Sequence, residues 1–163
     1  MSATFDVLAW NELAAALLED FTALPVRERN LARRAFLGPD RHGRLLYGVS
    51  DHQNFARHCA QRLRATAARY PDDLAVTSLI RELQAGSELF RELWASHDVT
   101  DESVLRKTFR HPVVGPITVN CDVLDITDRD QRVVIYTAVP GSADEQALRL
   151  LSVVGTQRLD VAG

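Results

Sequence analysis

Cysteine is scarce in this sequence of 163 residues, which contains only Cys59 and Cys121. Their spacing matches no zinc motif, so we interpret each thiol as a small core side chain in a reducing compartment. No apolar run approaches the roughly 18 residues that a membrane-spanning helix requires, and the first residues lack the basic and apolar regions of a signal peptide. We therefore expect a cytoplasmic protein that contacts no membrane, and no motif in the sequence requires a cofactor.

Lysine is almost absent, because Lys107 is the one lysine beside eighteen arginines. The net charge of −3 conceals a strong asymmetry, since residues 27–69 contain ten arginines against three acids. A basic surface of this kind suits nucleic acid, an acidic partner domain or an anionic ligand. Solvated helix faces explain the same charges equally simply.

Apolar periodicity predicts an α+β domain, and a chain of this length can bury a core as one domain. Three strands late in the sequence form an antiparallel meander. Strand 132–139 is apolar on both faces, so we expect it at the centre of the sheet with cover on each side. The expected helices are 12–19, 25–37, 51–70, 73–86, 87–97 and 142–151, and the expected strands are 5–10, 107–112, 117–124 and 132–139.

Several expected helices follow a residue that suits an N-cap. Asn11 is one of these, and a direct ligand contact is the alternative for its side chain. Asn30 lies close to the apolar side of helix 25–37. A buried asparagine needs hydrogen-bond partners, so Asn30 is either tied to a neighbouring backbone or presented to a cavity. The other expected N-caps are Asp51, Asp73, Ser87 and either Ser142 or Asp144.

An ordered set of short segments spans most of the chain, the main three being Leu93–Val99, Phe109–Gly115 and Val134–Ser142. With residues 8–11, 29–30, 36–37 and 70–73, these segments resemble the ligand-binding domain of MmyB-like transcription regulators. The resemblance implies an α+β fold with a PAS-like antiparallel sheet and several helices packed on one face. It also implies that residues 1–163 form a single sensor domain of an actinobacterial-type regulator. A helix-turn-helix domain usually precedes the sensor in that family and is not expected within these residues, so we expect DNA contact only through such a domain.

Our leading hypothesis is a non-enzymatic sensor that binds a small apolar or fatty-acid-like molecule in a pocket between sheet and helices. The resemblance suggests an acidic head group, which Arg110 or an arginine within residues 27–34 would pair with. Core packing explains the aromatic residues of the predicted site equally well, and backbone contacts explain its histidines. The predicted pocket residues are Asn11, Asn30, Phe36, Phe90, Trp94, His97, Arg110, His111, Ile135 and Tyr136.

Two other functions fit parts of the sequence. His97 and Asp98 form an adjacent His-Asp pair of the kind that metal-dependent hydrolases use, with His58 as a further ligand, but the remaining ligands are not evident. An interaction module is the second alternative, in which strand 132–139 and the first helix form a dimer face. That reading is compatible with a sensor, and we expect a homodimer.

Overall fold

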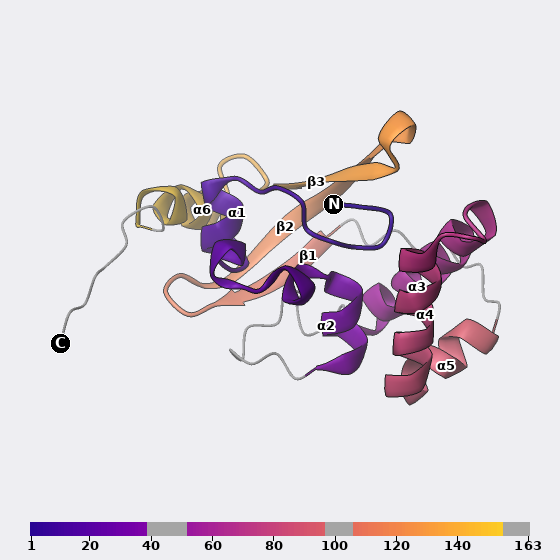
Figure 1. Ribbon diagram of the computed structural model, residues 1–163. Helices are drawn as coiled ribbons and strands as arrows, with labels where there is room; N and C mark the ends of the chain where they lie inside the picture. Colours follow the sequence, from indigo (N-terminus) through magenta and orange to yellow (C-terminus); the bar gives the residue numbers. More distant parts are fainter. Residues whose placement is uncertain (39–51, 97–105, 155–163) are drawn as a thin grey trace.

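The computed structural model describes residues 1–38, 52–96 and 106–154, and the predicted α+β class is confirmed for this part of the chain. Helices α2 to α5 gather at one end, and the sheet extends from them toward α1 and α6 (Figure 1). The helices are α1 (Glu12–Leu17), α2 (Leu31–Leu37), α3 (His52–Arg69), α4 (Leu74–Gly86), α5 (Glu88–Ala95) and α6 (Ala143–Val154), and the strands are β1 (Arg106–His111), β2 (Gly115–Ile126) and β3 (Gln131–Thr137).

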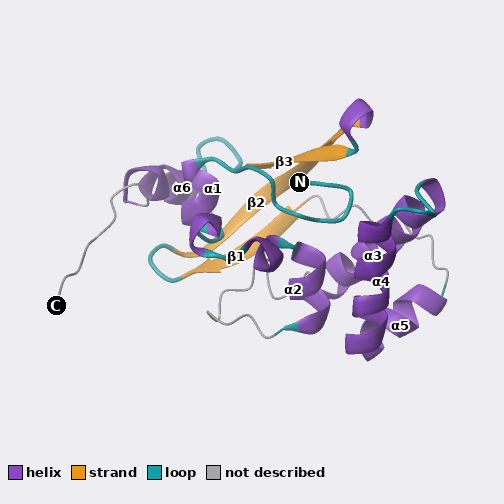
Figure 2. Ribbon diagram, in the orientation of Figure 1, coloured by secondary structure: helices purple, strands orange, loops and turns teal. Residues whose placement is uncertain are grey.

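The three strands form an antiparallel sheet in the order β1-β2-β3 (Figure 2). The expectation that strand 132–139 is central is wrong, because β2 is the central strand and β3 lies at an edge. In a meander each strand pairs with its neighbour in sequence, so the middle strand takes the centre whatever its composition. Val133 and Ile135 are 42% and 39% exposed. One of the two apolar faces of β3 is therefore left uncovered.

One face of the sheet is covered by α1 and α6. Ile117 and Val119 alternate along β2 toward this face, and Phe109 is the cross-strand partner of Ile117 in β1. The core that they form with the two helices contains Leu17, Phe109, Ile117, Val119, Leu148 and Leu151. We call the face that carries Ile117 and Val119 the covered face, and the opposite one the outer face.

Helices α2 to α5 have a core of their own. This helical core is centred on Leu63, Leu83 and Phe90, all of which are fully buried, and Phe5 packs into it from the N-terminal segment. The resemblance led us to expect helices packed on one face of the sheet, whereas these four pack mainly on one another beside it. The lengths and apolar spacing of α3, α4 and α5 nevertheless follow the predicted segments, because each buries a stripe of its surface.

Most of the predicted N-caps are confirmed. The Asn11 side chain accepts a hydrogen bond from the Ala14 amide at 2.8 Å, and Asp73 caps α4 in the same way. Ser87 caps α5 and Ser142 caps α6. The remaining predicted N-cap, Asp51, lies outside the described residues.

The N-terminal segment is not the strand that we expected over residues 5–10. Its pairing is limited to isolated bridges, Ser2 with Gln131 and Asp6 with Asn30. Phe5 has a φ of 68°, which turns the chain in a left-handed conformation that a regular strand does not contain. Alternation over six residues therefore mimicked a strand where the chain forms a loop held by side chains.

Asn30 divides the predicted helix 25–37 into two parts. Its amide donates to the Thr4 carbonyl and to Asp6, both at 2.8 Å, and its side-chain oxygen accepts from the Arg33 amide at 2.9 Å. Asn30 is the N-cap of α2, and residues Val26–Arg29 before it form a short 3-10 turn. Of the two alternatives for this buried side chain, the structure confirms the one in which it is tied to neighbouring backbone.

Candidate functional site

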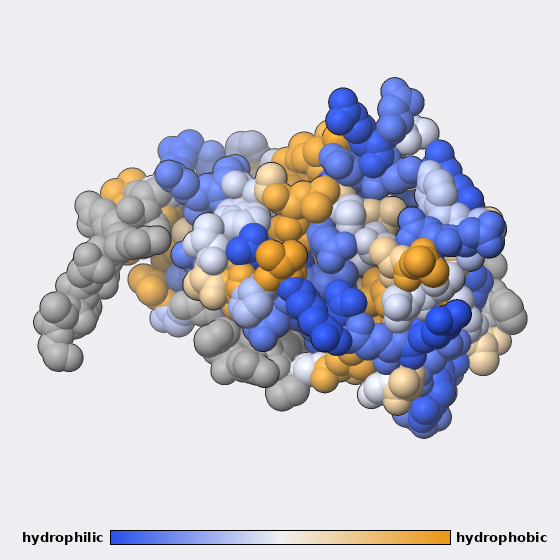
Figure 3. Space-filling model, in the orientation of Figure 1, coloured by the Kyte–Doolittle hydropathy of each residue, from blue (hydrophilic) through white to orange (hydrophobic). Residues whose placement is uncertain are grey.

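Two neighbouring cavities lie where the N-terminal segment passes β3. The first, which we call the apolar cavity, has a volume of about 510 Å³ and lies between residues 7–11, α1 and β3. Figure 3 shows a hydrophobic band on this side of the molecule, over β3 and the N-terminal segment. The side chains that define its walls include Val7, Trp10, Leu18, Phe21, Val134 and Tyr136.

Aromatic contacts hold the walls of the apolar cavity in place. The rings of Trp10 and Phe21 lie 5.2 Å apart, and the Arg29 guanidinium covers the Trp10 ring at 5.5 Å. On the opposite wall, Tyr136 makes an edge contact with Phe109 at 5.5 Å. Each wall therefore packs against a cluster of its own, Trp10 with Phe21 and Tyr136 with the core beneath α1 and α6.

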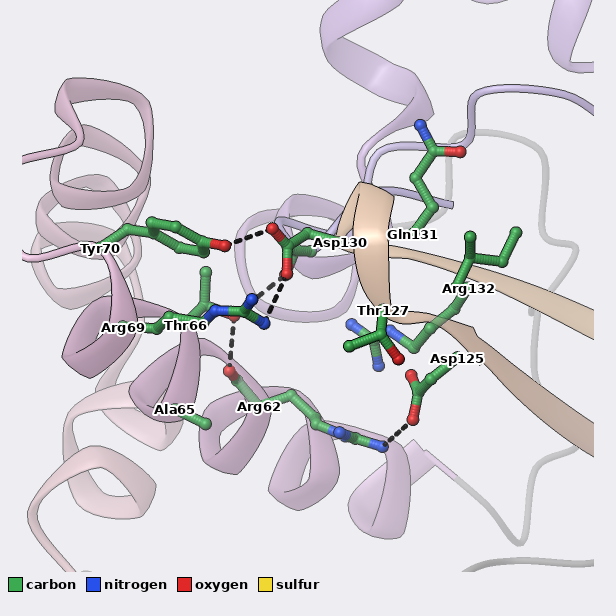
Figure 4. A pocket seen from close by; sticks show the side chains of 12 residues that line it. Arg62, Ala65, Thr66, Arg69, Tyr70, Asp125, Thr127, Asp130, Gln131 and Arg132 are labelled. Atoms are coloured by element: carbon green, nitrogen blue, oxygen red, sulfur yellow. Dashed lines mark hydrogen bonds and ion pairs between the residues drawn. The ribbon is translucent and has the colours of Figure 1, made fainter.

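The second, which we call the polar cavity, has a volume of about 250 Å³ and lies between α3 and the turn that joins β2 to β3. Three arginines reach it: Arg62 and Arg69 from α3, and Arg132 from β3 (Figure 4). Arg69 pairs with Asp130 at 2.8 Å, whereas the Arg62 and Asp125 side chains are 3.6 Å apart.

Asp130 is the centre of a small network at the rim of the polar cavity. It has a φ of 49° in the β2–β3 turn, where aspartate tolerates a left-handed conformation better than most residues. The Tyr70 hydroxyl donates a hydrogen bond to Asp130, and this bond raises the pKa of Tyr70 above its ordinary value. The turn is thereby tied to the end of α3.

Arg132 borders both cavities, as do its neighbours Gln131 and Ile126. The residue is only 7% exposed, and its guanidinium lies over the Phe5 ring at 4.7 Å. Burial lowers the pKa of Arg132 below the usual arginine value, and the positive charge of Arg62 lowers it further. Its backbone pairs with Met1, whose carbonyl accepts from the Arg132 amide at 2.9 Å.

The family model described as "MmyB-like transcription regulator ligand binding domain" matches residues 1–151, which is most of the chain. The chain belongs to this family. This MmyB-like domain thus has a regulatory, ligand-sensing role within transcription regulators. The comparisons with curated proteins and with solved structures give no match.

Two of the pocket residues predicted from the sequence line the apolar cavity of the MmyB-like domain. Asn11 borders it at the start of α1, where the side chain also serves as the N-cap, and Tyr136 borders it from β3. Ile135 is adjacent to Tyr136 but points to the outer face, because side chains alternate along a strand. The two residues come from distant parts of the sequence, and the fold brings them to one cavity.

The predicted aromatic wall lies elsewhere in the MmyB-like domain. Within the helical core, Phe36 meets the Phe90 ring edge-on at 4.9 Å, and Trp94 stacks on Phe90 at 5.4 Å. Arg64 extends this stack by lying over the Trp94 ring at 5.4 Å. These aromatics line neither cavity, and packing of α2 against α5 accounts for them.

The predicted polar contacts are also dispersed. The His111 ring is buried, with its Nε2 atom 2.9 Å from the Ala16 carbonyl and its Nδ1 atom accepting from the Val113 amide at 3.2 Å. Arg110 is exposed on the outer face, and Asn30 is committed to the backbone contacts given above. His97 lies outside the described residues.

Sequence reasoning missed most of the cavity wall, including Val7, Trp10, Val134 and above all Arg132. The alternation of Arg132, Val134 and Tyr136 along one strand would have placed these three side chains on a shared face. The resemblance segments also included residues 8–11 and 134–142, which meet at this cavity. The sequence alone does not reveal that the N-terminal segment lies beside β3.

The structure gives no support to a metal-dependent hydrolase. Within residues 1–38, 52–96 and 106–154, no group of three or more His, Cys, Asp or Glu side chains is arranged to hold a metal ion. His97 and Asp98 lie outside those ranges, and His58 is half-buried on α3.

Among the helices described, none is both long enough and apolar enough to cross a membrane.

Proposed function

We propose that this MmyB-like domain is a non-enzymatic sensor that binds a small apolar or fatty-acid-like molecule in the apolar cavity. The observation that carries the proposal is the cavity itself, which lies between the sheet and helical elements of a domain whose family is defined by ligand binding. Its volume of about 510 Å³ is within the range of roughly 300–1,000 Å³ that is typical of small-molecule sites.

The chemistry of the walls favours an apolar ligand with few polar contacts. Val7, Leu18 and Val134 offer aliphatic surface, and burial of such surface is the main source of affinity for an alkyl chain. Asn11 and Tyr136 supply polar groups at the side of the cavity, which suits the orientation of a ligand rather than a reaction. We propose that catalysis plays no part.

Signal transmission would use the N-terminal segment, since this segment forms one wall of the cavity. Residues 7–11 line the apolar cavity, while Asp6 and Phe5 contact Asn30 and the helical core. A ligand that binds one arrangement of this segment more tightly would shift the population toward it. We propose that this shift changes how an attached DNA-binding domain is presented in the cytoplasm.

The proposal is tested by thermal unfolding of delipidated protein with saturated and unsaturated acyl chains. A ligand at about 100 times its dissociation constant stabilises the folded state by about 2.7 kcal/mol. For a chain of this size, that stabilisation raises the melting temperature by about 5–10 °C. The absence of a shift with any acyl chain, at concentrations well above a micromolar dissociation constant, would overturn the proposal.

A matched pair of variants locates the binding site. Val134→Trp fills the apolar cavity from β3, so we expect it to remove most of the ligand-induced shift. Val153→Trp makes the same change on α6, where the side chain is 62% exposed, and should leave the shift intact. Equal shifts in the two variants would place the ligand elsewhere.

A further inference from the structure

We infer that Arg132 binds the acidic head group of the ligand, and that the ligand is an amphiphile whose head carries a single negative charge. The inference rests on the proposed function, because it assigns the two parts of the ligand to the two cavities. The alkyl part would occupy the apolar cavity, and a carboxylate would enter the polar cavity. Arg132 is the charged residue common to the walls of both.

The environment of the Arg132 guanidinium favours an anion. The residue is only 7% exposed, and Figure 4 shows the side chain directed toward α3 and the polar cavity. Among residues 1–38, 52–96 and 106–154, its contact is the face of the Phe5 ring, and no carboxylate lies within ion-pair distance. A buried guanidinium without a paired anion is costly, so an entering carboxylate gains more here than at the surface.

The charges around the polar cavity do not balance. Three arginines and two aspartates line it, which leaves one positive charge in excess. Arg69 is already paired with Asp130, and Asp125 is the nearest acid to Arg62. The charge of Asp125 also acts on Arg132, so Arg62 and Arg132 share one acid, and one negative charge on the ligand would neutralise the excess.

Arg62 is only loosely paired with its neighbouring acid. Its distance of 3.6 Å to Asp125 is long for a charge-assisted hydrogen bond, and both side chains are partly exposed. Arg62 also raises the cost of the Arg132 charge, since the two cations repel. A carboxylate between them would turn that repulsion into attraction to both, in the planar geometry that guanidinium groups favour.

The arginines that the sequence suggested for the head group are placed differently. Arg33 pairs with Glu82 at 2.9 Å within the helical part of the molecule, and Arg34 pairs with Glu19, which follows α1. Arg110 lies on the outer face of the sheet, away from the apolar cavity. Arg29 covers Trp10 and donates to the Leu24 carbonyl, so its guanidinium already has partners.

The test compares decanoate with decan-1-ol, which share an alkyl chain and differ in the charge of the head. We expect wild-type protein to bind decanoate roughly ten- to a hundredfold more tightly in calorimetric titration, as a charged hydrogen bond predicts. Arg132→Met should abolish this preference while changing the affinity for decan-1-ol by less than about twofold. Arg149→Met removes an exposed arginine from α6 and should keep the wild-type preference.

The outcomes separate this inference from the proposed function. Equal affinity of the wild-type protein for the two ligands would overturn the head-group assignment and leave the apolar site standing. Unchanged decanoate binding in Arg132→Met would do the same. Binding of neither ligand, together with no response to other acyl chains, would overturn both. If Arg132→Met fails to fold, Arg132→Lys keeps the charge without the planar fork, and we expect it to weaken decanoate binding alone.

Discussion

Single side chains, rather than backbone pairing, determine the path of the N-terminal segment. Asp6 accepts hydrogen bonds from Ser2 and Thr4 with one oxygen and from Asn30 with the other. The Asn30 side chain also donates a hydrogen bond to the Thr4 carbonyl, so these bonds hold both sides of the turn at Phe5. The same loop carries the backbone onward to the wall of the apolar cavity, which makes its geometry part of the site.

The pH dependence of stability is predicted to include a contribution from Asp6. Partial burial would raise the pKa of this carboxyl, but the hydrogen bonds from Asn30, Thr4 and Ser2 outweigh burial and hold the pKa below 3.8. Stability from Asp6 is therefore fully present above that ordinary value and is lost as the pH falls through the lower folded pKa. We expect the stability gap between wild type and Asp6→Asn, measured by urea unfolding, to shrink as the pH falls from about 5 to about 2.

Glu12→Gln is a suitable comparison, because this residue lies exposed in the first turn of α1, outside the Asp6 network. Its gap from wild type should stay small across the same range. A constant gap for Asp6→Asn would show that the network adds nothing to the acid sensitivity of the fold.

N-caps such as Asn11, Asp73 and Ser87 could be predicted because they depend on a few neighbouring residues. Asn30 was only half predictable: the need for partners follows from burial, but Thr4 and Asp6 are more than twenty residues away. Arg132 was not recognised at all. Its burial depends on Phe5 and Met1, at the other end of the chain, and nothing in the local sequence indicates that contact.

At the scale of elements, an ion pair connects the sheet side of the molecule to the helical side. Glu19 follows α1, which packs on the sheet, and Arg34 belongs to α2, which packs in the helical core. Their side chains are 10% and 16% exposed, so the pair is largely removed from water. A pair of this kind costs much to break, because the remaining partner stays buried.

Arg34→Met is predicted to destabilise the protein by about 2–4 kcal/mol, because it leaves the Glu19 carboxylate without its ionic partner. Chemical denaturation provides the measurement. Adding Glu19→Gln to that variant should recover part of the loss, since the buried charge is then gone. Arg27→Met is the matched control: Arg27 is 72% exposed, and its partner Glu82 keeps Arg33.

We expect the control to cost less than about 1 kcal/mol, as exposed ion pairs usually do. Similar losses for Arg34→Met and Arg27→Met would contradict the role of burial. An additive double variant would contradict direct coupling between Glu19 and Arg34.

Helices and strands were predicted far better than their arrangement. The meander and the helices after residue 51 follow from apolar periods of two and 3.6 residues, which the structure retains. The N-terminal strand and the single helix 25–37 were wrong because side-chain hydrogen bonds of Asn30 and Asp6 override the local pattern. The central position of strand 132–139 was wrong because composition does not determine the order of a sheet.

At the scale of the whole molecule, the outer face of the sheet supports the proposal of a homodimer. Leu124 and Val133 are directly paired across β2 and β3, and they are 54% and 42% exposed. Ile135 extends the same apolar patch along β3. Adjacent exposed apolar side chains of this kind are typical of interaction surfaces.

Light scattering over a range of protein concentrations should give twice the chain mass for the wild type. Leu124→Lys places a charge in the patch, so we expect it to shift the population to the monomer. Leu150→Lys, at an equally exposed apolar position on α6, should not. A wild-type monomer at all concentrations would refute the homodimer, and a dimer in both variants would move its interface away from the outer face.

The two buried thiols have a practical consequence. Cys59 lies in the helical core and Cys121 on the covered face of the sheet, so each side of the molecule contains one native thiol. Burial raises the pKa of Cys59 above its ordinary range, which keeps the thiol unreactive while the core is closed. The rate of alkylation at each position therefore reports the transient opening of its own half. The chain thus carries two intrinsic probes, one for each half, and they could follow the response to an acyl chain without any engineered label.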